Sequence, residues 1–201
     1  MKKNNLFIII FTMFFTYSMP SIGAVLNIEN GALLGAEGVN INGTMYNVTF
    51  QGAPCTLLFN GCNDTSDFFF TDVDSGQAAN LALLNQVFKD TLFGLFDSNP
   101  NLTNGCTAST SYCSVITPIS PSATGFAIGT FLNNSTLESG DYYTGIWSNI
   151  GIEADFGSTR YYPSLTYAVW SGPSPVPVPA SVWLFCSGLI ALVGMRKKSS
   201  S

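Results

Sequence analysis

The stretch "GVNINGTMYNVTFQG", residues 38–52, is the part of the sequence that most directly predicts a fold. Asn42-Gly43 at its centre can adopt the positive φ values that a two-residue hairpin turn requires. After the turn, apolar Tyr46, Val48 and Phe50 alternate with Asn47 and Thr49, which is typical of a strand with one buried and one solvated face. The stretch therefore predicts a β-hairpin, and the preceding "VLNIENGALLG" is expected to add a short strand.

Further strands are predicted in the second half of the chain, where short apolar segments alternate with turn residues. The segments are "SVITPI", "SATGFAIGTFLNN", "DYYTGIWSNIGIEADFG" and "SLTYAVWSG". Thr, Tyr, Phe, Trp, Ile and Val dominate them, and Gly, Asn and Pro lie between, which is the composition of strands and turns. We expect four or more strands here. The run Phe68 to Phe70 is also interpreted as a buried strand.

One main helix is predicted over about 74–96. Leu81, Leu84, Phe88 and Leu95 recur at helical spacing, and Asp74 is expected to cap the first turn with Gln77 three residues later. The predicted fold class is α+β, mostly β, in which this helix packs on one or more antiparallel sheets.

The N-terminal segment has the layout of a secretory signal peptide. Two lysines follow Met1, the apolar run "LFIIIFTMFF" comes next, and a helix-breaking stretch ends in small residues at Gly23 and Ala24. The apolar run is too short to span a bilayer, which takes about 20 residues. Residues 1–24 are therefore predicted to be removed on export, with an uncleaved anchor as the alternative.

The C-terminal segment predicts a short membrane helix. Residues 182–195 carry no charge, and Arg196, Lys197 and Lys198 follow at once. A helix of that length covers about 21 Å against a hydrocarbon core of about 30 Å, so it is a marginal anchor. Basic residues stay on the cytoplasmic side, which places the preceding chain outside. The predicted organisation is a body over 25–172, a Pro-rich linker over 173–181, the helix over 182–195 and a basic tail over 196–201.

The order of parts in this segment resembles a PEP-CTERM sorting signal in its VPxPA variant. Pro177, Val178 and Pro179 form the motif, the apolar helix contains Ser187-Gly188, and the basic cluster closes the chain. Val178 stands where the name-giving pattern has a glutamate. The resemblance covers about 26 residues and implies an exported protein of a Gram-negative bacterium, processed by an exosortase in the inner membrane and then sorted to the cell surface or an exopolysaccharide matrix. A plain C-terminal anchor is the alternative.

The charge of the body excludes several functions. The chain has seven basic residues, of which five lie in the tails, so the body keeps two basic and all twelve acidic residues and has a formal charge of −10. Such a surface repels nucleic acid and anionic polymers.

Several kinds of catalytic residue and motif are missing from the sequence. No histidine is present, which excludes Ser-His-Asp and Cys-His catalysis and His-ligated metals. No phosphate-binding glycine loop with a lysine occurs either. We expect no cofactor and no enzymatic activity.

The four cysteines of the body are predicted to form disulfides. Cys55 and Cys62 enclose six residues, and so do Cys106 and Cys113. Four cysteines allow three connectivities, and the two short loops are favoured because short loops close more readily. A zinc site is the rival interpretation, although the spacing exceeds that of the usual zinc knuckle. Cys186 lies in the apolar tail.

Three weaker site hypotheses rest on acids and aromatics. The acids Asp64, Asp67, Asp72 and Asp74 could supply oxygens to an irregular calcium site, or could serve as a solvated loop and helix cap. A carboxylate-based hydrolase could use Asp141, Glu153 and Asp155. A carbohydrate-binding module could use the aromatic side chains of Tyr142, Tyr143, Trp147, Tyr161, Tyr162 and Trp170. The alternative is that these side chains pack in the core and between strands. The preferred expectation is a structural or adhesive surface or matrix protein.

Overall fold

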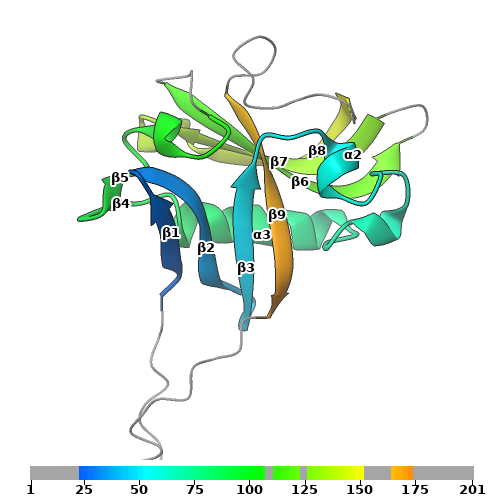
Figure 1. The fold of residues 1–201 in the computed structure, drawn as a ribbon, viewed down its shortest axis with the longest axis horizontal. Coiled ribbons are helices and arrows are strands. Elements are labelled where there is room, and N and C mark those ends of the chain that lie inside the picture. The colour runs from blue at the N-terminus through cyan, green and yellow to red at the C-terminus, as the bar shows by residue number, and fades with distance from the viewer. Residues whose placement is uncertain (1–22, 107–110, 123–125, 152–163, 174–201) are drawn as a thin grey trace, which may run out of the picture.

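The computed structural model describes residues 23–106, 111–122, 126–151 and 164–173, which form one seven-stranded sheet with one main helix across it (Figure 1). The order across the sheet is β1-β2-β3-β9-β6-β7-β8. Its strands are β1 (Val25–Glu29), β2 (Ala32–Ile41), β3 (Thr44–Gln51), β6 (Tyr112–Ser122), β7 (Phe126–Ser135), β8 (Tyr142–Gly151) and β9 (Leu165–Pro173). The α+β, mostly-β prediction is confirmed at this level.

The first three strands form a meander joined by two Asn-Gly turns. Asn42 and Gly43 have φ values of 51° and 90°, so the predicted hairpin of β2 and β3 is confirmed. Asn30 and Gly31 have φ values of 50° and 80° and join β1 to β2. The segment in which one short strand was expected before the hairpin therefore contains β1, a second Asn-Gly turn and the first residues of β2.

The C-terminal strand β9 occupies the centre of the sheet. It pairs antiparallel with β3, where Phe50 lies opposite Ala168, and parallel with β6, where Ser114 lies opposite Leu165. It thereby joins the β1-β2-β3 meander to the antiparallel β6-β7-β8 meander. The sheet is mixed rather than purely antiparallel, so that part of the prediction was wrong: the chain crosses from the β8 edge back to the middle before β9 begins.

The main helix α3 (Val73–Gln86) is shorter than predicted. Asp72, not Asp74, is its N-cap, because the Asp72 carboxylate accepts the backbone N–H of Ser75 at 2.9 Å. The helix ends at Gln86, and the next residues form a small hairpin of β4 (Asp90–Thr91) and β5 (Gly94–Leu95). Leu95 fits the helical spacing by coincidence, because it lies in this hairpin and is exposed.

The helix packs closely on the sheet through a buried polar network. The side chain of Asn80 accepts the Thr117 hydroxyl of β6 at 2.9 Å and donates to the Thr130 hydroxyl of β7 at 3.1 Å. The indole N–H of Trp170 in β9 also donates to Thr117, at 3.2 Å. Close approach requires Gly76, because a Cβ there would lie 2.8 Å from the Thr130 hydroxyl oxygen. Asn80 therefore ties the helix to β6 and β7, and Thr117 extends the network to β9.

Apolar side chains surround this network and form the main core. Phe50 stacks on Phe88 with ring centroids 5.3 Å apart, and Leu83, Val87 and Val115 are fully buried nearby. These residues come from the helix and from one face of the sheet, as the alternation along each strand requires.

A second, smaller core covers the opposite face of the sheet near β9 and β6. Tyr167 and Ile116 point to this face, and α2 (Cys55–Leu58) and the 3₁₀ turn η2 (Thr65–Asp67) lie over it. Two further 3₁₀ turns, η3 (Pro100–Leu102) and η4 (Glu138–Gly140), precede β6 and β8.

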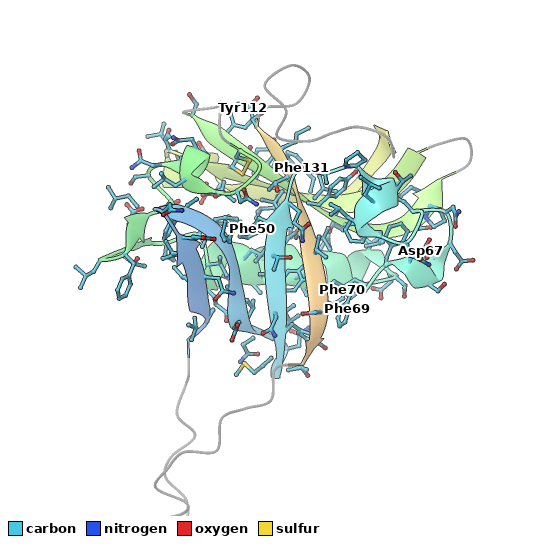
Figure 2. The ribbon with its side chains drawn as sticks, viewed as in Figure 1. Phe50, Asp67, Phe69, Phe70, Tyr112 and Phe131 are labelled. Atoms are coloured by element: carbon cyan, nitrogen blue, oxygen red, sulfur yellow. A yellow bond between two sulfur atoms is a disulfide. The ribbon has the colours of Figure 1, made fainter. Side chains whose placement is uncertain are left out.

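The run Phe68 to Phe70 is not a strand, so that prediction was wrong. Phe68 packs in the second core and Phe70 in the main core, while Phe69 is exposed. Phe69 and Phe70 lie beside the end of β9 (Figure 2), and Phe70 meets Trp170 edge to face at 5.5 Å. The run is apolar because it connects two cores on different faces.

Both favoured disulfides are present. Cys55 bonds to Cys62 and Cys106 bonds to Cys113, and all four residues are buried. The first pair closes the loop that covers the second core, and the second pair ties the segment before β6 to its first residues. The zinc alternative was therefore wrong, because each sulfur is already bonded to another sulfur.

Loss of the first disulfide is expected to destabilise the domain. The Cys55→Ala/Cys62→Ala variant frees a loop of eight residues, which in the chain-entropy account costs about 2.5 kcal/mol. We expect a lower urea midpoint with an unchanged slope. Cys186→Ala is the matched control, since that cysteine lies outside the body, and an equal midpoint for all three proteins would contradict the role given to this loop.

Candidate functional site

Both ends of the domain lie at the same end of the sheet. Val25 at the start of β1 pairs with Glu37, and Pro173 at the end of β9 pairs with Tyr46, near the β2–β3 turn. Figure 1 shows the start of β1 and the end of β9 on the lower side of the view. The described domain thus runs from the residue after the predicted cleavage position to four residues before the predicted sorting motif.

The residues of the two predicted targeting segments lie almost wholly outside the described part of the chain. This holds for the signal peptide up to residue 22, for the motif residues Pro177, Val178 and Pro179, and for the membrane helix over 182–195 with its basic stop Arg196, Lys197 and Lys198. Within the described ranges, no helix has both the length and the apolar character needed to cross a membrane.

Three of the four acids proposed for calcium accept hydrogen bonds in local caps. Asp64 and Asp67 form a capping box around η2: Asp64 accepts the backbone N–H of Ser66 at 2.8 Å, and Asp67 accepts that of Asp64 at 3.0 Å. These backbone hydrogen bonds lower the pKa of both carboxyls. The bond from Ser75 does the same for Asp72, and Asp74 is exposed in the first turn of α3.

The structure therefore favours the cap interpretation over the calcium site. Among the residues it describes, no three His, Cys, Asp or Glu side chains come together in a group that could hold a metal ion. Because the pKa values of Asp64, Asp67 and Asp72 are lowered in the fold, their contribution to stability is present above the unfolded carboxyl pKa and is lost as pH falls.

The acids proposed for a hydrolase are not brought together by any described contact. Asp141 precedes β8, and its carboxylate accepts the backbone N–H of Ser135 at 2.7 Å, which closes the turn between β7 and β8. Glu153 and Asp155 lie outside the described residues. The observed role of Asp141 is thus to hold a turn.

The aromatics proposed for sugar binding have different positions. Trp170 belongs to the main core, so its proposed place on a binding surface was wrong. Tyr142 and Tyr143 are both exposed, but they lie opposite Asn133 and Leu132 and so point to opposite faces of the sheet. The side chain of Trp147, and Tyr161 and Tyr162 entirely, lie outside the described part.

A different pair of aromatics shares one face. Tyr112 lies opposite Ser135 and Tyr142 opposite Asn133, so both point to the face of β7 that carries Asn133. Both are exposed, by 44% and 50%, and strand spacing puts their Cα atoms about 12 Å apart. Phe131 extends this face, with its ring centroid 5.9 Å from that of Tyr142; Figure 2 labels Tyr112 and Phe131. Sequence reasoning missed Tyr112 because its face depends on strand register.

The exposed tip of the β4–β5 hairpin was also missed. Leu92 and Phe93 form the turn between the two strands and are both highly exposed. The prediction placed them inside the helix. Their adjacency, followed by Gly94, is the signal that could have indicated a turn instead.

Comparisons with protein families, with curated proteins and with solved structures find no match to this chain.

Proposed function

We propose that this chain is an exported, non-enzymatic protein of a Gram-negative bacterium that is sorted through its C-terminal segment to the cell surface or an extracellular matrix. The inner membrane holds it during processing by an exosortase-type enzyme. At the cell surface or in the matrix, its role is structural or adhesive.

The C-terminal segment carries this proposal. Val176-Pro177-Val178-Pro179-Ala180, the uncharged helix over 182–195 and the basic cluster stand in the order of a PEP-CTERM sorting signal. Each part has a physical role: the prolines favour an extended chain that a processing enzyme can bind, and the basic residues stop transfer on the cytoplasmic side.

Two features of the domain are consistent with export. The pairs Cys55–Cys62 and Cys106–Cys113 are disulfides, which persist in oxidising compartments. Pro173 ends the central strand β9, so cleavage near residue 179 would remove no residue of the described sheet. A processed domain would therefore keep its whole core.

Labelling of intact host cells tests the destination. An antibody raised against the folded domain should label unpermeabilised cells or the material around them. Labelling that requires permeabilisation of the outer membrane would contradict surface or matrix delivery.

A carbohydrate-binding module is a second candidate, because the Tyr112–Tyr142 face offers two exposed aromatic rings on one side of the sheet. Aromatic side chains have apolar faces and a polar tip, which suits contact with sugar rings. Ser135 lies half-buried on the same face, and its hydroxyl could donate a hydrogen bond to a sugar.

This second candidate predicts that Tyr112→Ala/Tyr142→Ala loses binding to the host exopolysaccharide. We expect the dissociation constant to rise at least tenfold, which corresponds to a loss of about 1.4 kcal/mol in binding free energy, in a pull-down or calorimetric titration. Tyr143→Ala is the control, because that tyrosine is also exposed but lies on the other face. No measurable binding by the unmodified protein would remove the candidate.

A further inference from the structure

The β4–β5 hairpin presents an apolar tip outside the body of the domain. Leu92 is fully exposed, Phe93 is 78% exposed and Leu95 is exposed at the base of the same turn. Figure 1 shows the hairpin projecting sideways beyond β1 and β2. Single exposed apolar residues are normal on a protein surface, but three within four positions form a patch.

The hairpin is held rigidly at its base. The Asp90 carboxylate accepts the backbone N–H groups of Asp97 and Ser98 at 3.1 and 3.0 Å and the Ser98 hydroxyl at 2.6 Å. The hydroxyl of Thr91 accepts the Phe93 N–H at 3.1 Å. These bonds fix the base from which Leu92 and Phe93 project.

A buried anchor fixes this base to the sheet. Phe96 directly follows the hairpin and is fully buried, and its carbonyl accepts the Asn134 side-chain amide of β7 at 2.8 Å. Gly94 allows the ring of Phe96 to pass beneath the turn, because a Cβ at that position would collide with the ring.

The turn itself does not require apolar residues. Asn30-Gly31 and Asn42-Gly43 form turns with positive φ, which restrict the residue type, whereas Leu92 and Phe93 have no positive φ and occupy a turn that most residues, including polar ones, can form. Apolar side chains such as those of Leu92 and Phe93 are stabilised when a contact removes their surface from water. The choice of residues therefore points to a contact.

The shape and charge of the tip favour a lipid surface. A convex tip of two side chains is far smaller than the roughly 1,000 Å² of a stable protein interface, whereas a lipid surface needs no matching pocket. A second copy is opposed by the formal charge of −10 on each body, and the base of the hairpin carries Lys89 beside the acids Asp90 and Asp97. The same charge opposes anionic lipids and leaves zwitterionic ones.

We propose that the Leu92–Phe93 tip inserts among the zwitterionic lipids in the interfacial region of the membrane in which the C-terminal segment is anchored. The inference rests on the proposed function for that anchor. The nine residues 173–181 reach at most about 30 Å when extended, so the anchored domain stays within that distance of the bilayer. Because this tether gives the tip a high effective concentration at the membrane, even a weak contact is enough for the tip to stay bound. The contact would orient the domain with its β4–β5 hairpin toward the bilayer.

Fluorescence quenching of the full chain in vesicles tests this inference. The Phe93→Trp variant is reconstituted in phosphatidylcholine with brominated acyl chains, and the signal of the unmodified chain, which has three tryptophans, is subtracted. We expect the added tryptophan to shift to shorter wavelength and to be quenched. Leu57→Trp is the matched control, because Leu57 is 76% exposed on α2 and is expected to stay in water.

Three results would overturn the inference, and they separate it from the proposed function. Equal quenching of both variants, or none in either, in a chain that floats with the vesicles overturns the tip contact alone. A chain that does not float with the vesicles contradicts the anchor and the tip contact together. Concentration-dependent dimers that Leu92→Ser abolishes would place a second copy, rather than lipid, on the tip.

Discussion

Replacing Asn80 by alanine is expected to lower the free energy of unfolding by about 3 kcal/mol. Asn80 is fully buried, and its amide joins Thr117 of β6 to Thr130 of β7. Alanine removes both hydrogen bonds and leaves the two hydroxyls with fewer partners in a site that water does not reach. Since domains are stable by only about 5–15 kcal/mol, a large part of the stability would be lost. Urea denaturation with both disulfides intact measures the change.

Two further variants show whether the hydrogen bonds are responsible. Asn85→Ala on the exposed side of α3 should change stability by less than about 0.5 kcal/mol. The double variant Asn80→Ala/Thr130→Val should lose less stability than the sum of the losses in the two single variants. It removes the Thr130 hydroxyl together with the Asn80 amide, so this hydroxyl is not left buried without its partner. A loss of less than 1 kcal/mol in Asn80→Ala would contradict the role of the network.

The Pro177→Ala/Pro179→Ala variant is expected to retain its C-terminal segment in the host. Each proline fixes φ and would prevent the proposed helix over 182–195 from extending backward, so the motif is expected to stay extended. With alanine at both positions the helix can continue into the linker, and a processing enzyme loses its extended substrate. We expect the fraction of uncut chain to rise at least about tenfold, which corresponds to a loss of roughly 1.4 kcal/mol in recognition.

Pro175→Ala is the control for this variant, because it changes the same linker outside the motif. It should be processed like the unmodified chain. Processing of Pro177→Ala/Pro179→Ala at the normal rate would show that the motif is not read, and the plain-anchor alternative would then be preferred.

Local features of the fold were predictable from the sequence. The Asn42-Gly43 turn and the alternation after it require only neighbouring residues, and both are present. The two disulfides follow from short loops in the same way. The four strands of the second half were each recognised by their composition.

Features that depend on distant contacts were not predictable. Nothing in "SLTYAVWSG" indicates that this last strand enters the middle of the sheet, because that position is set by its pairing with β3 and β6. Asn80 looks like a solvent-facing residue until Thr117 and Thr130 are brought to it. Leu95 matched the helical spacing, but it lies in a hairpin whose base is held by contacts of Asp90 with Asp97 and Ser98.

The candidate sites divide in the same way. The proposed sorting signal is a linear pattern and is inferred from the sequence alone. The aromatic face of Tyr112 and Tyr142 and the Leu92–Phe93 tip exist only through strand register and a fixed turn. Conversely, four acids close in sequence suggested a metal site, whereas each carboxylate that the fold fixes is occupied by a nearby backbone N–H.

The intact mass of the protein in each cell fraction of its host tests the central claim most directly. The account predicts a chain that lacks residues 1–24 and the residues beyond about Pro179, found outside the inner membrane with both disulfides formed. A chain that retains residues 182–201 and stays in the inner membrane would contradict sorting, and the surface or matrix role would lose its main support.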